Sequence, residues 1–175
     1  AADQKVFAEW FEKLPEFKQR LFQKPSLENI LNAHANELFV TAHKYYVDHK
    51  TGKSSTLTAE RSQAIIETAF KCLTKIDESR AVRNRMTLQE ITDIIHQPDI
   101  STQVVSGLLR LFRLQGNTFL RPFIMEADNP SKMLPEQVLD ITHESLIRNW
   151  DLLENWAKEE HENWQNFQDF HKQLQ

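Results

Sequence analysis

The stretch that decides the fold lies at residues 138–150 and reads VLDITHESLIRNW. Its first five residues carry the β-branched and apolar side chains typical of a short strand. From His143 the apolar spacing changes to three and four residues, which predicts a helix that reaches Leu174 as one rod or two. We expect its buried stripe to contain Leu146, Trp150, Leu153, Trp156 or Ala157, Trp164, Phe167, and Phe170 or His171.

Two short helices and another strand precede this stretch. Residues 87–90 read TLQE, a capping-box pattern that opens a helix, and Pro98 ends that helix. Ser101 is a suitable N-cap for a second helix over 102–114, and residues 118–124 favour a strand. Helix, turn, helix and two strands is the order expected of a winged-helix module.

The first part of the chain is predicted to be helical. Amphipathic spacing indicates one or two helices over residues 3–23, a long helix after Ser26, and a further helix over 57–73. Residues 50–55 read as a loop, and the arginine-rich residues 77–85 read as an exposed connection. The stripe of the long helix is expected to hold Leu27, Ile30, Leu31, Leu38, Phe39, Ala42, Tyr45 and Tyr46.

These elements predict a mainly α fold. It consists of a helical bundle followed by a winged-helix module with a two-stranded β wing and a long C-terminal helix. The predicted boundaries place a helical domain at 1–76, the winged-helix module at 77–143 and the C-terminal amphipathic helix at 144–175. The chain opens with Ala-Ala-Asp rather than Met, so we expect a piece of a longer protein.

Composition narrows the function classes. The 175 residues include 21 Lys or Arg and 25 Asp or Glu, giving a net charge of -4, which excludes a whole-chain polycation. No apolar run is long enough for a membrane span. The single cysteine, Cys72, cannot form an internal disulfide, so a reducing, cytoplasmic setting is expected. In its apolar helical stretch this thiol is expected to be a buried filler rather than a nucleophile.

Motifs for catalysis are incomplete. The sequence Thr51-Gly52-Lys53-Ser54 resembles the end of a phosphate-binding P-loop, but Val47 stands where the motif requires its first glycine. His143-Glu144 resembles half of a zinc-binding helix, but Ile147 replaces the second histidine. The chain is therefore expected to be neither an ATPase by itself nor a metalloenzyme.

Two non-enzymatic functions follow from the residues alone. As a DNA-binding transcriptional regulator, the chain would place its 102–114 helix in the major groove, with Arg110 and Arg113 on phosphates. The local basic excess is modest, so nucleic acid is not expected as a partner. A structural adaptor would instead dock a repeat domain through the tryptophan-rich C-terminal helix.

The segment 138–150, with Leu153 and Trp156 after it, resembles the end of the winged-helix region in STAND-type signalling NTPases. There a strand runs into His-Glu-x-Leu-x-Arg-x-Trp and an acidic helix. Residues 57–90 are similar to the helical stretch and Arg-rich connection before that module, and the resemblance covers roughly residues 26–160. It implies a non-catalytic, autoinhibitory and nucleotide-sensing region of a bacterial parent ATPase.

The resemblance also assigns a site and partners. In apoptotic ATPases and plant resistance proteins, the histidine of a Met-His-Asp motif contacts the β-phosphate of ADP, and Thr142-His143-Glu144 looks like the counterpart, with two substituted positions. His143 would then sense ADP or ATP bound by an upstream P-loop domain, and a repeat or effector domain would follow. From its residues alone, His143 is more simply a structural residue at the start of the helix.

Overall fold

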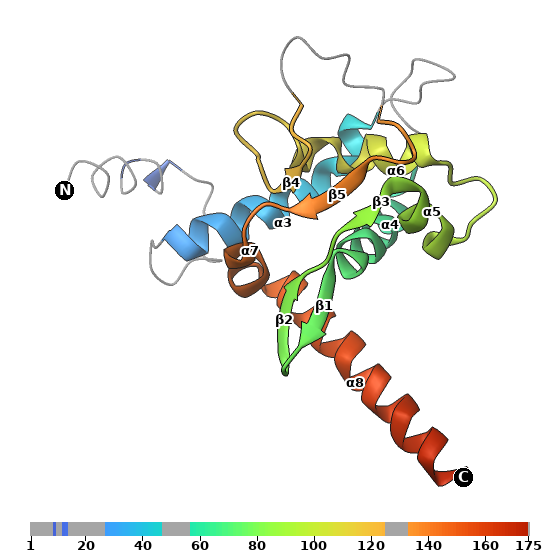
Figure 1. Cartoon of the computed structure of the whole chain (residues 1–175). Helices are drawn as coiled ribbons and strands as arrows, with labels where there is room; N and C mark the ends of the chain where they lie inside the picture. The colour runs from blue at the N-terminus through green and yellow to red at the C-terminus, as the bar shows by residue number, and fades with distance from the viewer. Residues whose placement is uncertain (1–8, 10–11, 14–26, 47–56, 125–132, 175) are drawn as a thin grey trace.

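The computed structural model describes residues 9, 12–13, 27–46, 57–124 and 133–174 (Figure 1). Apart from residues 9 and 12–13, the predicted helices over 3–23 lie outside these residues, as do the Ser26 cap and the loop at 50–55. Within them the protein is mainly helical with small antiparallel sheets, as predicted. The helices are α3 (Leu27–Tyr45), α4 (Ala59–Cys72), α5 (Leu88–Ile95), α6 (Thr102–Leu109), the 3-10 turn η1 (Arg110–Phe112), α7 (Glu144–Asn149) and α8 (Asp151–Gln173).

Side-chain caps fix where three of these helices begin. The Thr58 hydroxyl accepts a hydrogen bond from the backbone N–H of Arg61 at the start of α4. Thr87 and Glu90 form a complete capping box at α5, and Ser101 caps α6. Each cap satisfies a backbone donor that has no partner inside its helix. The helix starts predicted at residues 87 and 101 are therefore confirmed.

A β-hairpin occupies the region predicted to be an exposed connection: residues 77–80 are exposed as predicted, but the segment forms paired strands rather than an irregular connection. Strand β1 (Thr74–Asp77) pairs antiparallel with β2 (Arg80–Arg83). The turn residues Glu78 and Ser79 have φ angles of 46° and 65°. Two consecutive positive φ values are typical of the tight hairpin turn that usually contains asparagine and glycine. Because this turn contains neither residue, no hairpin is predicted here from the residue types.

A second sheet contains three strands in the order β3-β5-β4. The central strand β5 (Val138–Ile141) pairs antiparallel with β3 (Met86–Thr87) and with β4 (Leu120–Arg121). The two strands predicted near 118–124 and 138–142 are confirmed, although β4 is short. The predicted two-stranded wing is incomplete, because β3 adds a strand on the other side of β5. Strand β5 is thus held on both edges where it leads into α7.

One hydrophobic core joins these elements, and Trp150 is fully buried in it. Its ring centroid lies 4.9 Å from that of Phe70 on α4 and 6.0 Å from that of Phe112 on η1. Its Nε1 donates a hydrogen bond to Oδ1 of Asn36 on α3 at 2.7 Å. Trp150 therefore ties the C-terminal segment to three earlier elements.

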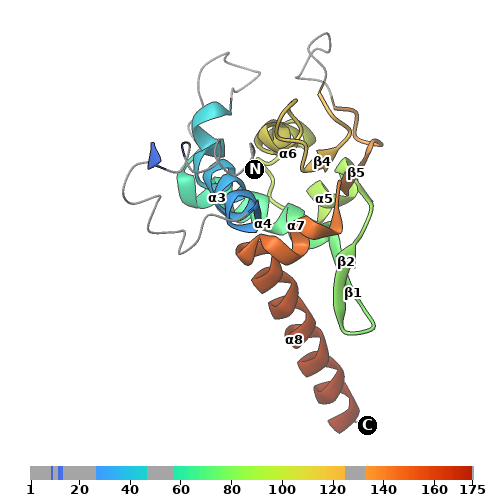
Figure 2. The same ribbon diagram turned by 90° about the vertical axis from the view of Figure 1, so that its left-hand side faces the viewer.

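The C-terminal helix is two helices, because Trp150 is extended with φ -97° and ψ 102° between α7 and α8. Asn32 of α3 holds the break by accepting a hydrogen bond from the backbone N–H of Asp151. The predicted stripe is buried from Leu146 to Ala157. It is exposed beyond that point because α8 extends away from the rest of the molecule (Figures 1 and 2). The exposed members are Trp164, Phe167 and Phe170, at 59–60%.

Two details of the helical predictions are also corrected. Helix α6 ends at Leu109 rather than 114, and the chain continues as η1. Tyr45, predicted to be inward, is 62% exposed, whereas its neighbour Tyr46 is buried.

A Cβ atom at Gly107 of α6 would lie 2.7 Å from the Tyr46 ring, so this close approach requires glycine.

We expect Trp150→Phe to destabilise the chain by about 2–3 kcal/mol, because it removes ring contacts and leaves the Asn36 carbonyl oxygen without its donor. Urea denaturation at equilibrium measures this loss. The matched control is Trp164→Phe, which changes an exposed ring and should alter the free energy of unfolding by less than about 0.5 kcal/mol. Equal losses in both variants would contradict the central role of Trp150.

Candidate functional site

His143 is exposed at the junction between β5 and α7. Its backbone is extended, with φ -139° and ψ 139°, and its side chain forms no capping hydrogen bond with α7. On one side the backbone N–H of Thr142 donates to the carbonyl of Phe119, and on the other Leu146 and Ile147 are buried. The backbone at His143 is thus fixed while its imidazole faces solvent.

Arg83 of β2 joins the hairpin to this junction. Its Nη1 donates hydrogen bonds to the carbonyl oxygens of Ile141 at 3.1 Å and Thr142 at 3.3 Å. The same atom lies 3.8 Å from Oδ2 of Asp140. Two carbonyls and a carboxylate therefore surround one guanidinium immediately before His143. This role of Arg83 was not predicted, because Arg83 was expected to lie in an exposed connection.

The first turns of α7 carry a further ion pair. Arg148 Nη2 lies 3.4 Å from Oε2 of Glu144, one helical turn away. Both side chains are largely exposed, so the pair adds little stability. The guanidinium of Arg148 nevertheless offsets the negative charge of Glu144, which is next to His143.

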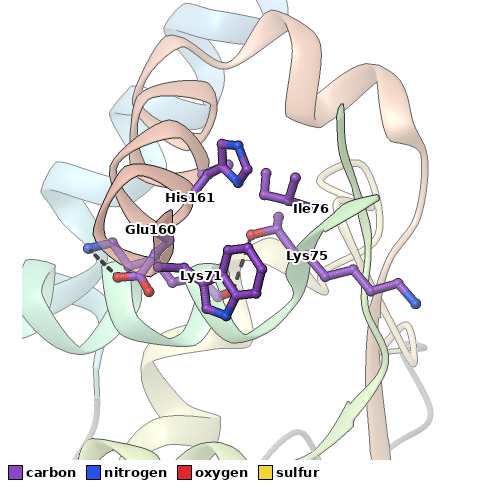
Figure 3. Close-up of a pocket in the computed structure, with 8 residues that line it drawn as sticks. Lys71, Lys75, Ile76, Glu160 and His161 are labelled. Atoms are coloured by element: carbon purple, nitrogen blue, oxygen red, sulfur yellow. Dashed lines mark hydrogen bonds and ion pairs between the residues drawn. The ribbon is translucent and has the colours of Figure 1, made fainter. Parts of the chain in front are cut away.

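Two cavities flank the hairpin where it faces α8. One of about 330 Å³ contains Ile76, Ala157 and Trp164 in its wall. Lys71 Nζ there lies 3.4 Å from Glu160 Oε1 (Figure 3). The other, of about 260 Å³, lies between the hairpin, α7 and α8. Its lining includes Ser79, Arg80, Ile147, Arg148, Lys158 and His161.

Arg113 does not lie where a DNA contact would need it. It is only 7% exposed, and its Nε donates a hydrogen bond to the carbonyl oxygen of Pro122 at 2.7 Å. Burial lowers the pKa of its guanidinium. Arg110 lies one turn earlier and is half-buried, with its Nε shielded from solvent and unpaired within the described chain. The predicted phosphate contact of Arg113 is therefore wrong.

Cys72 is a partly buried thiol at the end of α4. Burial, reinforced by the charge of Glu160, raises its pKa to about 11. Since the thiolate is the reactive form, this thiol is a poor nucleophile at neutral pH. In the part of the chain that the structure describes, no three His, Cys, Asp or Glu residues gather as metal ligands. Nor does any described helix have the length and apolar character needed to cross a membrane.

We expect Cys72 to react slowly with iodoacetamide at pH 7. Below its pKa the thiolate fraction rises about tenfold per pH unit. The pH profile of the alkylation rate should therefore have its midpoint near the folded pKa of about 11. The chain unfolded in urea serves as the control, and its midpoint should fall to the ordinary value near 9.0. Coincident profiles would show that burial does not control this thiol.

The comparisons with known proteins give a family. The chain matches the family described as Novel STAND NTPase 1 over residues 45–175. No curated protein and no solved structure matches it significantly. The matched region holds the hairpin, the three-stranded sheet, His143 and both C-terminal helices. Because the match covers well over half of the sequence, the chain belongs to the Novel STAND NTPase 1 family.

Proposed function

We propose that this chain is a non-catalytic regulatory region of a cytoplasmic STAND NTPase, and that His143 senses the nucleotide. The nucleotide would be held by a P-loop domain elsewhere in the parent protein, with a repeat or effector domain as a further partner. Membership of the Novel STAND NTPase 1 family supports the assignment to a STAND NTPase. The observation that carries the proposal is the exposed imidazole of His143 on a fixed backbone.

The chemistry of the junction suits a phosphate contact. An imidazole N–H can donate a hydrogen bond to a phosphate oxygen, and a charged acceptor strengthens that bond. The neighbouring Glu144 would repel a phosphate, but its ion pair with Arg148 offsets this charge. Because Arg83 and β5 already hold the backbone, little further ordering is needed when a nucleotide approaches.

The arrangement of α5, α6, β4 and β5 supports the winged-helix assignment as part of this proposal. The elements follow one another in the order helix, helix, strand, strand, and β5 returns beside β4. In the proposed mechanism this unit closes over bound ADP, with His143 contributing a contact that the ATP-bound form lacks. A contact made in only one state shifts the equilibrium toward that state. ADP would therefore hold the parent protein inactive.

The DNA-binding alternative has no comparable support. The Nε of Arg113 donates a hydrogen bond to a backbone carbonyl. The helix that was predicted to enter the major groove ends at Leu109. A phosphate-binding surface requires exposed cations, and one of its two candidates is buried. We therefore do not propose DNA binding.

We expect His143→Ala in the full-length parent protein to speed ADP release by about tenfold or more, since a hydrogen bond to a charged group contributes about 1.5–3 kcal/mol. Basal activity should rise in parallel. The off-rate of a fluorescent ADP analogue measures the effect. Ser145→Ala is the matched control, because Ser145 is exposed in the same turn of α7, and it should leave the off-rate unchanged. An unchanged off-rate in His143→Ala would refute the sensor assignment.

A second variant tests whether Arg83 positions that junction. Arg83→Lys keeps the positive charge but loses the planar group that serves two carbonyls. We expect a severalfold faster ADP release, because His143 is held less firmly. Arg80→Lys is the control, since Arg80 is exposed on the same strand and should have no effect. The assignment fails if Arg83→Lys releases ADP at the same wild-type rate as its control while retaining the wild-type thermal stability.

A further inference from the structure

The smaller of the two cavities beside the hairpin, of about 260 Å³, is lined by basic side chains from three elements. Arg80 lies on β2, Arg148 in the last turn of α7, and Lys158 and His161 on α8. The hairpin lies beside the first half of α8 (Figures 1 and 2). Lys158 and His161 are three residues apart and therefore share one side of that helix. The fold thus brings together side chains that can all donate hydrogen bonds to an anion.

The remaining lining of this cavity is held by the hydrophobic core. Ile147 is 1% exposed, and Ile76 and Ala81 add further apolar side chains to the lining. Strand β2 packs against both α7 and α8, so the three elements that carry the basic residues hold one another in place. Little conformational entropy is therefore lost when a ligand enters. Apolar walls also strengthen the attraction between a cation and an anion, because they lower the local dielectric constant.

The lining cations keep hydrogen-bond donors that the protein itself does not use. The side chain of Arg80 forms no hydrogen bond or ion pair with any residue that the structure describes. Arg148 Nη2 lies 3.4 Å from Glu144 Oε2, and Lys158 Nζ lies 3.0 Å from Glu154 Oε1. Exposed pairs of this kind are weak, and each uses one of several donors of its guanidinium or ammonium group. The other donors are available to a ligand.

Most acidic side chains on this part of α8 do not offset the charge of the cavity. Glu159 and Glu160 lie 4.0 Å and 3.4 Å from Lys71 Nζ, beside the larger cavity. Glu154 is the acidic residue among the described lining residues of the smaller one. Three lining cations therefore outnumber one lining carboxylate, and Glu144 outside the lining offsets one cation further. The cavity is positive in a chain whose net charge is -4, which favours an anionic ligand.

We propose that this cavity binds a phosphate group, as the free ion or as part of a small phosphomonoester. Donors from three elements approach from different directions, which suits the oxygens of a tetrahedral phosphate better than a planar carboxylate. Arg80 and Arg148 provide planar forks that match phosphate oxygens, and Lys158 provides a point charge. His161 and the Ser79 hydroxyl add neutral donors.

The volume of the cavity limits the ligand to a small molecule, because pockets for drug-sized ligands measure about 300–1,000 Å³. The cavity lies at the end of α7, and His143 precedes the start of that helix. Phosphate binding here is therefore separate from the nucleotide contact proposed for His143. The parent protein would respond to a phosphorylated small molecule in addition to its nucleotide.

An NMR titration of the isotope-labelled 175-residue chain with inorganic phosphate tests the proposal. The backbone amide signals of Ser79, Arg80 and Arg148 should shift and reach saturation, and those of α5 should stay unchanged. Sodium chloride at matched ionic strength is the control and should cause no saturable shift, because chloride offers no set of oxygen acceptors. A parallel titration with β-glycerophosphate distinguishes the two sources of the phosphate group. Tighter binding identifies either the free ion or the phosphomonoester as the preferred ligand.

Two variants change the affinity in opposite directions. Arg80→Ala should raise the phosphate dissociation constant by about tenfold or more, because it removes a charged donor. Glu154→Gln should lower it severalfold, since it removes the lining carboxylate and frees Lys158. A misfolded variant would not gain affinity. The matched control is Lys75→Ala, which removes a cation from the same hairpin beside the larger cavity and should leave the constant unchanged.

Three results would each overturn the proposal. The first is the absence of saturable shifts with both phosphate compounds at millimolar concentrations. The second is an equal affinity in Arg80→Ala and Lys75→Ala. The third is an unchanged or weaker affinity in Glu154→Gln.

Discussion

The hydrogen bond from Trp150 to Asn36, with the aromatic packing around that indole, is the interaction on which the rest of the structure depends. Trp150 lies at the one extended residue between α7 and α8. Its burial fixes where α7 ends and in which direction α8 leaves the core. A polar indole N–H is buried at low cost only when it has an acceptor, so Asn36 of α3 is as necessary as the ring itself.

The sequence predicted those parts of the fold that depend on local chemistry. The Thr87 and Glu90 capping box and the Ser101 cap act over three residues, and each begins a helix as predicted. The hairpin escaped prediction because its Glu78-Ser79 turn reaches positive φ angles without glycine or asparagine. Periodicity showed which side of α8 is apolar. It could not show where the neighbouring elements stop, and so Trp164 and the residues beyond it were wrongly expected to be buried.

The candidate site was also predicted only in part. The resemblance identified His143, and the structure adds that its imidazole is exposed on a fixed backbone. The positions of Arg83 and Arg113 in the structure depend on contacts between residues that are distant in the sequence. Arg83 reaches carbonyls at 141 and 142, about 60 positions away, and Arg113 is enclosed by the segment around Pro122. Neither contact can be predicted from the neighbouring residues, because an exposed arginine and an arginine bound to a backbone carbonyl have similar neighbours in the sequence.

The dependence of α7 on the core constrains how a switch built on His143 would move. A helix of six residues is not stable by itself, so α7 exists because Leu146, Ile147 and Trp150 are buried. Moving His143 relative to the core would break these contacts together with the bond to Asn36. The free energy lost with these contacts is larger than the free energy gained from one hydrogen bond to a nucleotide. If His143 senses the nucleotide as proposed, a change of nucleotide should therefore displace this region as a rigid body, and α8 would move with it.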